Sequence, residues 1–222
     1  MTTTLVTVAH GTRRDGGNEV ARLLTAAAGE RLGGPAVTTY VELSEPLFAD
    51  VVAGLTEPAV VVPLLLSTGF HLRTDLPEAL AEAGAPVRMG PSFGPDPLLA
   101  QAQVARLLEA GAQPGQRVVL VAAGSSDPDA TADQLAAVAH LARAWDGPVE
   151  LAVLSGLGTR FRDVVRPGDA VAPYLLSPGF FSDRVAKEAP EGVVVADVLG
   201  DHPLVVDLLV QRAQALLATP VG

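Results

Sequence analysis

The chain has 222 residues, no cysteine and a formal net charge of −10, and 49% of its residues are hydrophobic. The absence of cysteine excludes disulfides, thiolate nucleophiles and zinc sites with Cys ligands. The acidic balance argues against a nucleic-acid partner, which requires a basic surface. The longest strongly apolar run, residues 59–66, is much shorter than the roughly 20 residues of a membrane helix, and residues 1–5 lack the features of a signal peptide. We therefore expect a cytoplasmic protein with no membrane partner.

Short apolar runs alternate along the chain with longer segments that are rich in Ala and Leu and have helical periodicity. Several runs are apolar on both faces, which is typical of strands buried in a parallel sheet. The predicted elements, in chain order, are strand 5–9, helix 18–32, strand 36–42, helix 46–55, strand 59–65, helix 75–83, strand 87–89, helix 97–109, strand 117–122, helix 130–145, strand 150–154, strand 170–176, strand 193–195 and helix 203–217. This alternation predicts an α/β protein with parallel sheets.

The second half of the chain repeats motifs of the first half. The matching blocks are 8–12 with 121–125, 63–71 with 173–181, and 94–98 with 200–204. Residues 110–116 between the copies have the composition of a linker. We therefore predict an internal duplication with two tandem α/β domains facing a central cleft. The N-terminal domain, 1–112, would carry the active site, and the degenerate C-terminal repeat, 117–222, would form the other cleft wall.

Two histidines of the first copy have no counterpart in the second, where Ala123 replaces His10 and Phe181 replaces His71. His10 and Glu42 end the first two predicted strands, and His71 lies beyond the third. Because ligands of open parallel sheets bind outside the carboxyl ends of the strands, we expect these three side chains on one rim. Two imidazoles and a carboxylate suit Fe²⁺, Co²⁺ or Ni²⁺, and a neutral His can also accept a proton near pH 7.

Other residues near these motifs suit an anionic ligand. Arg13, Arg14 and Arg73 would form a positive rim that can bind carboxylates or phosphates. Gly69 would let backbone N–H groups approach a ligand closely. A structural interpretation stays open beside this one: Glu42 could be an acidic residue near a helix N-terminus, and each arginine an ordinary solvated charge.

The order and spacing of these motifs resemble the sirohydrochlorin chelatase family, which belongs with the class II tetrapyrrole chelatases, in its fused two-domain form. The resemblance spans nearly the whole chain. It rests on Val8-Ala9-His10-Gly11-Thr12-Arg13, Glu42-Leu43-Ser44-Glu45-Pro46, the blocks at 63–71 and 94–97, and the second-half motifs at 124–128 and 199–203.

The resemblance implies insertion of Fe²⁺, for siroheme, or Co²⁺, for cobalamin, into sirohydrochlorin without ATP. His10 and His71 would be catalytic, with His10 as proton acceptor, and the metal would be bound at His10, Glu42 and His71. No cofactor beyond the substrate metal is implied, and the fused chain would be a monomer that acts as a pseudo-dimer. The carboxylates of the tetrapyrrole would contact Arg13, Arg14, Gly69 and Arg73.

Two other functions remain open from the sequence. A non-catalytic carrier of metal or tetrapyrrole would use the same residues without turnover. A histidine phosphatase is suggested by His10-Gly11-Thr12-Arg13, but those enzymes have Arg directly before the His, where this chain has Ala9. The sequence does not choose between iron, cobalt and nickel, because affinity order alone does not set metal selectivity.

Overall fold

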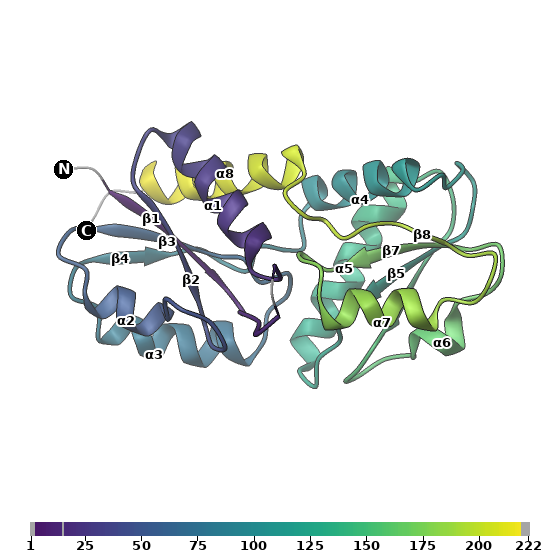
Figure 1. Cartoon of the computed structure of the whole chain (residues 1–222), viewed down its shortest axis with the longest axis horizontal. Helices are drawn as coiled ribbons and strands as arrows, with labels where there is room; N and C mark the ends of the chain where they lie inside the picture. Colours follow the sequence, from purple (N-terminus) through teal and green to yellow (C-terminus); the bar gives the residue numbers. More distant parts are fainter. Residues whose placement is uncertain (1–2, 15, 219–222) are drawn as a thin grey trace. The chain divides into compact units, whose positions relative to one another are not determined.

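Two four-stranded parallel sheets form the framework of the protein, one in each repeat (Figure 1). The computed structural model describes residues 3–14 and 16–218. The first sheet has the order β2-β1-β3-β4 and the second the order β6-β5-β7-β8. The strands are β1 Thr4–Ala9, β2 Ala36–Tyr40, β3 Ala59–Pro63, β4 Val87–Met89, β5 Val118–Ala122, β6 Val149–Val153, β7 Ala170–Tyr174 and β8 Val194–Val195. All eight predicted strands are present, and the predicted fold class, α/β with two tandem parallel-sheet domains, is confirmed.

Along the chain, helices connect successive strands, because parallel strands can be joined only by a long crossover connection. They are α1 Glu19–Leu32, α2 Phe48–Ala53, the π-helical turn η1 His71–Asp75, α3 Leu76–Ala81, α4 Pro97–Glu109, α5 Pro128–Ala144, α6 Phe161–Val164, α7 Phe180–Glu188 and α8 Pro203–Ala218. The sequence predicted six of these and missed η1, α6 and α7. A helix as short as α6 shows no periodicity. The helix α7 does carry an apolar stripe, because Val185 is buried and Phe181, four residues earlier, packs against the same core, so its signal was present in the sequence and was overlooked.

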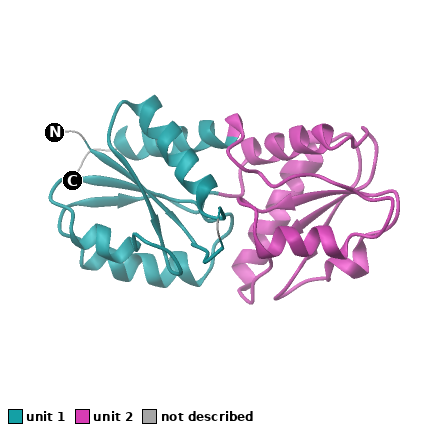
Figure 2. Ribbon diagram, viewed as in Figure 1, with its two compact units in different colours: residues 1–93, 205–222 teal, residues 94–204 magenta. Residues whose placement is uncertain are grey.

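The compact units do not coincide with the expected domains, 1–112 and 117–222. Residues 1–93 and 205–222 form the first unit, and residues 94–204 form the second (Figure 2). The last helix of each repeat is therefore exchanged: α4 lies in the second unit and α8 in the first. In the first unit Arg31 of α1 donates to Asp207 of α8 at 2.5 Å. Sequence repeats show the order of elements, but they do not show which sheet a terminal helix covers.

In the first unit, helices cover both faces of the sheet. Val6, Val8 and Val61 pack on one face against Phe48 of α2 and Leu76 of α3. On the other face the hydroxyls of Thr7 and Thr25 are hydrogen-bonded at 2.6 Å, which joins β1 to α1. Two-sided burial explains why these strands are apolar at successive positions.

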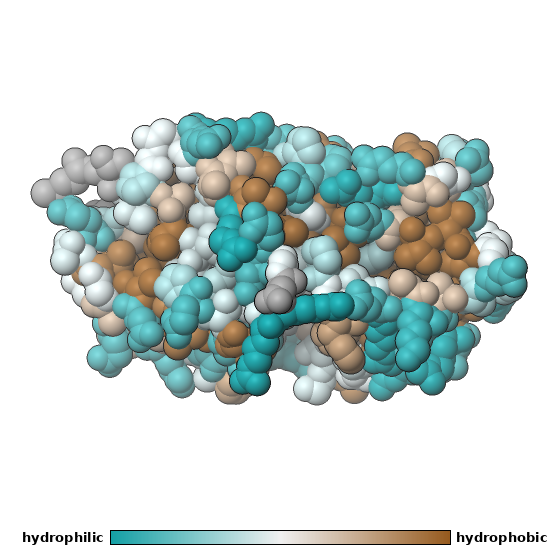
Figure 3. Space-filling model, viewed as in Figure 1, coloured by the Kyte–Doolittle hydropathy of each residue, from teal (hydrophilic) through white to brown (hydrophobic). Residues whose placement is uncertain are grey.

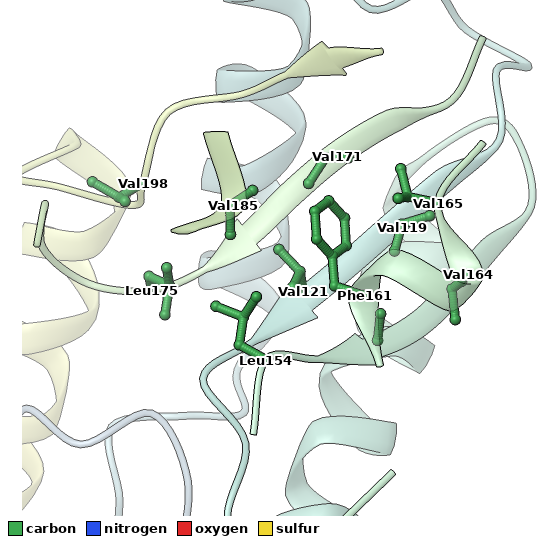
Figure 4. Close-up of a cluster of buried hydrophobic side chains, with 11 residues drawn as sticks. Val119, Val121, Leu154, Phe161, Val164, Val165, Val171, Leu175, Val185 and Val198 are labelled. Atoms are coloured by element: carbon green, nitrogen blue, oxygen red, sulfur yellow. The ribbon is translucent and has the colours of Figure 1, made fainter. Parts of the chain in front are cut away.

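The second unit repeats this construction. Val119, Val121 and Val171 of the central strands pack against Phe161 of α6 and Val185 of α7 (Figure 4). On the opposite face α5 buries Ala137 and Leu141. Each repeat therefore has a hydrophobic core of its own. Burying one such large side chain contributes roughly 1.5–3 kcal/mol to stability.

Hydrophilic residues are spread over the visible face of the protein, with smaller apolar groups between them (Figure 3). Of the helices in the described part of the chain, none is both long and apolar enough to cross a membrane.

Candidate metal centre

The first two strands bring His10 and Glu42 together. β1 ends at Ala9 and β2 at Tyr40, but backbone hydrogen bonds between the two segments continue beyond the strands: Val41 N–H donates to Ala9 O at 2.9 Å and Glu42 N–H to His10 O at 3.2 Å. This extension sets Glu42 beside His10, and the nearest atoms, His10 Nε2 and Glu42 Oε1, are 3.5 Å apart.

Gly11 makes this approach possible. Its φ is +95°, and a Cβ at this position would collide with the carbonyl oxygen of Glu42. Any other residue would be strained and would also push the two chain segments apart. The glycine after His10 is therefore required by the backbone, whether or not a ligand is bound.

His71 reaches the same rim by a longer route than the sequence suggested. Residues 64–70 lie between β3 and His71, which is the first residue of η1. The segment is anchored by Leu64 N–H, which donates to Val8 O at 2.8 Å, and by Arg73 N–H, which donates to Gly69 O at 3.1 Å. Single π-helical turns of this kind are frequent at functional sites.

The three side chains form one cluster. One ligand atom from each of His10, Glu42 and His71 lies within 4.8 Å of the others, and no other such group of His, Asp and Glu occurs within residues 3–14 and 16–218. The two imidazole rings are edge to face, with centroids 4.9 Å apart and an interplanar angle of 86°. Ligands of one ion at about 2.1 Å lie roughly 3–3.5 Å apart, so only small side-chain movements would close the site.

The hydrogen bonds of both imidazoles involve Nδ1, so that Nε2 of each ring is left for the cluster, where His10 Nε2 faces Glu42. His71 Nδ1 lies 2.5 Å from Asp75 Oδ2, and His10 Nδ1 lies 3.2 Å from the backbone oxygen of Gly11. A carbonyl oxygen only accepts, so the contact of His10 with Gly11 is a hydrogen bond in the tautomer that carries its hydrogen on Nδ1; the carboxylate of Asp75 favours the same tautomer in neutral His71. Histidine ligands of metals commonly have this outer hydrogen bond.

Asp75 was missed by the sequence analysis, which placed it at the start of a helix. A signal was present, because Asp75 follows His71 by four residues and side chains at this spacing lie on one helical face. The pair is partly exposed, with 32% of the His71 side chain and 33% of the Asp75 side chain accessible. Asp75 is therefore suited to orient His71.

The predicted substrate residues lie in the same loops as the cluster. Arg13 and Arg14 are exposed in the segment after β1, Arg73 is exposed within η1, and Gly69 is half-buried just before η1. Their contacts with a tetrapyrrole remain predictions, since their positions agree with such a role without testing it.

The second repeat keeps the backbone of this site without its ligands. Ser155 N–H donates to Ala123 O at 3.0 Å, as Glu42 donates to His10. A Cβ on Gly124, whose φ is +91°, would collide with the carbonyl oxygen of Ser155, as at Gly11. Phe181 takes the place of His71 and contacts Phe180 edge to face.

Comparisons with known proteins agree with this architecture. Sirohydrochlorin ferrochelatase of Bacillus subtilis (strain 168) is 28% identical over 211 residues, which cover 83% of this chain and 80% of that protein. The structure of SirB from Bacillus subtilis with Fe³⁺ matches with a TM-score of 0.84 and 25% identity, over 98% of this chain and 96% of the other. The structure of sirohydrochlorin chelatase SirB from Bacillus subtilis subspecies spizizenii in complex with cobalt also matches with a TM-score of 0.84. It is 24% identical, and the match covers 99% of this chain and 97% of the other.

The family resemblance inferred from the motifs is also confirmed by a family model. The model described as CbiX matches the chain twice, at residues 4–110 and 117–216. One match falls on each repeat, and together they cover nearly all of the sequence. The chain belongs to the CbiX family.

Proposed function

We propose that the protein is a chelatase that inserts Fe²⁺ or Co²⁺ into sirohydrochlorin without ATP. The observation that carries the proposal is the cluster of His10, Glu42 and His71, whose ligand atoms lie within 4.8 Å of one another. The B. subtilis relative, named a sirohydrochlorin ferrochelatase, supports the substrate, and the similar structures with Fe³⁺ and with cobalt support a metal of this class.

A site with at most three protein ligands leaves coordination positions open, which a metal in transit requires, and a ligand set of His71 and Glu42 leaves His10 Nε2 to accept protons. In the proposal His71 and Glu42 hold the incoming ion through Nε2 and a carboxylate oxygen. Asp75 keeps the His71 ring in its orientation through the hydrogen bond to Nδ1. Since the His10 and Glu42 side chains are each 51% exposed, ion and water can exchange at the site.

Metal insertion releases two protons from the pyrrole nitrogens as the ion enters the ring. His10 is the proposed acceptor, because its Nε2 has a free lone pair when Nδ1 carries the hydrogen. The His10 side chain is 51% exposed, so it can pass each proton on to solvent while Glu42 holds the ion. The balance is one metal dication in and two protons out, so the proposal needs no cofactor besides the metal that is inserted.

The substrate's eight carboxylates give the basic residues of these loops a role. Arg13, Arg14 and Arg73 are exposed on the segments that carry His10 and His71, and a guanidinium pairs with a carboxylate through two hydrogen bonds. Gly69 would allow a backbone N–H to approach one of these groups. These contacts are specific to the tetrapyrrole and are separate from metal binding.

The proposal leaves iron and cobalt as alternatives, because a site with two His and one carboxylate accepts both. The decisive experiment is a spectroscopic chelation assay with each metal on wild type, His10→Ala and His71→Ala. His140→Ala, at a half-buried position of α5 outside the cluster, is the matched control. We expect repeated turnover by wild type and His140→Ala, and a loss of about 100-fold or more for His10→Ala.

The same assay separates an enzyme from a carrier, and a separate phosphohistidine trapping experiment tests the phosphatase. A carrier would consume one equivalent of sirohydrochlorin and stop, and the proposal would then be wrong. Wild-type insertion rates in His10→Ala at saturating metal would remove the proton-acceptor role from His10. A phosphoryl group trapped on His10 would instead support a histidine phosphatase.

A further inference from the structure

Two exposed apolar side chains adjoin the candidate ligands. Leu43 follows Glu42 and is 43% exposed, and Phe70 precedes His71 and is 65% exposed. In the described part of the first unit only two other large apolar side chains are comparably exposed, Leu23 and Leu217. Half of the large apolar side chains that this unit exposes are therefore immediate neighbours of the metal cluster in the chain.

Leu43 also has an unfavourable backbone conformation. Its φ is +66°, and it is the only residue other than glycine with positive φ in the described part of the chain. The left-handed region is costly for a residue with a Cβ, and glycine would avoid the cost. The second repeat has Gly156 at the matching position, after Ser155, with a φ of +67°. Strain of this kind persists at functional sites, where the side chain is needed.

Phe70 has a counterpart in the second repeat. Phe180 directly precedes Phe181, as Phe70 precedes His71, and it is 70% exposed. The Phe70 ring lies edge to face with the His71 ring, with centroids 6.5 Å apart. Exposing an aromatic ring is unfavourable in water, and an exposed aromatic beside a site is suited to contact a flat ligand. The copy without metal ligands keeps this aromatic, so its role is not metal binding.

We propose that Leu43 and Phe70 form a ring-contact pair, which supports the apolar face of the tetrapyrrole and sets its central nitrogens toward the cluster. The inference rests on the proposed function and deepens it. A tetrapyrrole of this type is apolar over the faces of its ring and charged at its periphery. The arginines would bind the periphery, whereas the ring-contact pair would bind a face, and face contacts determine how close the nitrogens come to the metal.

The test is equilibrium binding of metal-free sirohydrochlorin, followed by absorbance, to Leu43→Ala and Phe70→Ala. Leu23→Ala is the matched control, because Leu23 is also a leucine that is 43% exposed, but on α1. We expect each of the two variants to bind about tenfold more weakly, equivalent to 1.4 kcal/mol, and Leu23→Ala to bind as wild type does. Affinity for Co²⁺ without the tetrapyrrole should stay within about twofold of wild type in all three.

Leu43→Gly makes the test sharper because it removes the strain and the side chain together. We expect a higher Tm with weaker binding of sirohydrochlorin, whereas a leucine with a packing role alone would give a lower Tm and unchanged binding. If wild type turns over sirohydrochlorin but Leu43→Ala and Phe70→Ala bind it as tightly as Leu23→Ala does, the inference is overturned and the proposed function stands. A wild type that neither binds nor metallates sirohydrochlorin would contradict the proposed function, and the inference with it.

Discussion

The His71 imidazole has two nitrogens with different partners. Nδ1 is hydrogen-bonded to Asp75, and the ring otherwise faces His10, whose centroid is 4.9 Å away. A carboxylate on the outer nitrogen fixes the tautomer and makes the inner nitrogen a better ligand. We therefore expect the metal affinity of the candidate site to depend on Asp75, which is not one of its three ligands.

Asp75→Ala should weaken metal binding by about tenfold or more, because His71 would lose its orienting hydrogen bond. A Co²⁺ titration followed by absorbance measures the affinity. Glu78→Ala, an exposed carboxylate nearby on α3, is the control and should bind as wild type does. Equal affinities for the two variants would show that Asp75 has no positioning role.

For individual residues, the sequence predicted which residue types lie at the strand ends, but it did not predict which side chains contact one another. His10 and Glu42 were placed because each closely follows an apolar strand, and parallel strands end at one edge. Asp75 was not placed, because its contact with His71 depends on the local winding of η1, which apolar periodicity does not report.

The turns after the first strand of each repeat are equivalent elements with different surroundings. Gly11 and Gly124 both have positive φ, and in both a Cβ would collide with a carbonyl oxygen of the neighbouring segment. Only the first of these segments carries a candidate ligand, Glu42. Comparing substitutions at Gly11 and Gly124 therefore separates the loss of stability caused by a distorted turn from the effect of the turn on the candidate metal site.

Gly11→Ala and Gly124→Ala should each lower the free energy of unfolding by roughly 1–3 kcal/mol, through backbone strain and displacement of the facing segment. Only Gly11→Ala should also lose metal affinity, because Glu42 would move away from His10. Urea unfolding and Co²⁺ titration of both variants test this. Equal metal affinity in the two variants would show that the turn does not position Glu42.

The elements themselves were largely predictable from the sequence. The eight strands were found because β-rich apolar runs are local, and α5 was found because it is long and buries Ala130, Gln134, Ala137 and Leu141 at helical spacing. The helix α6 was missed because four residues show no periodicity, whereas α7 was missed although Phe181 and Val185 lie on one apolar face at helical spacing.

For the molecule as a whole, the loss of ligands from the second repeat predicts the metal stoichiometry. Ala123, Ser155 and Phe181 occupy the positions of His10, Glu42 and His71. We therefore expect one equivalent of Co²⁺ per chain at saturation, measured by isothermal titration calorimetry. A second equivalent of similar affinity would show that a site exists outside the cluster.

Alkaline stability provides a second test on the whole molecule. Burial raises the pKa of Tyr174, and the charges of Asp133 and Asp96 add to the effect. The folded protein then keeps the Tyr174 proton above about pH 10, where the unfolded chain loses it. The unfolded state then binds fewer protons than the folded state above about pH 10. The contribution of Tyr174 to the free energy of unfolding is therefore complete below about pH 10 and falls as pH rises, by up to about 1.4 kcal/mol per pH unit.

Tyr174→Phe should remove this part of the alkaline slope. Urea unfolding at pH 9, 10 and 11 measures it, and the buried Trp145 in the second unit serves as the fluorescence probe. An unchanged slope in Tyr174→Phe would mean that ionisation of Tyr174 does not contribute.

The sequence by itself determined the strand order along the chain, the duplication, and the placement of His10 and Glu42 at strand ends, because these depend on local periodicity and on repeated motifs. Only the tertiary structure decided that α4 and α8 exchange units, that Asp75 is hydrogen-bonded to His71, and that Leu43 takes a left-handed conformation. The exchange of helices and the backbone of Leu43 are fixed when distant segments pack together, so no local pattern of residues encodes them. The contact of Asp75 with His71 spans only four residues, and its spacing is visible in the sequence, but the winding of η1 that brings the two side chains together is not.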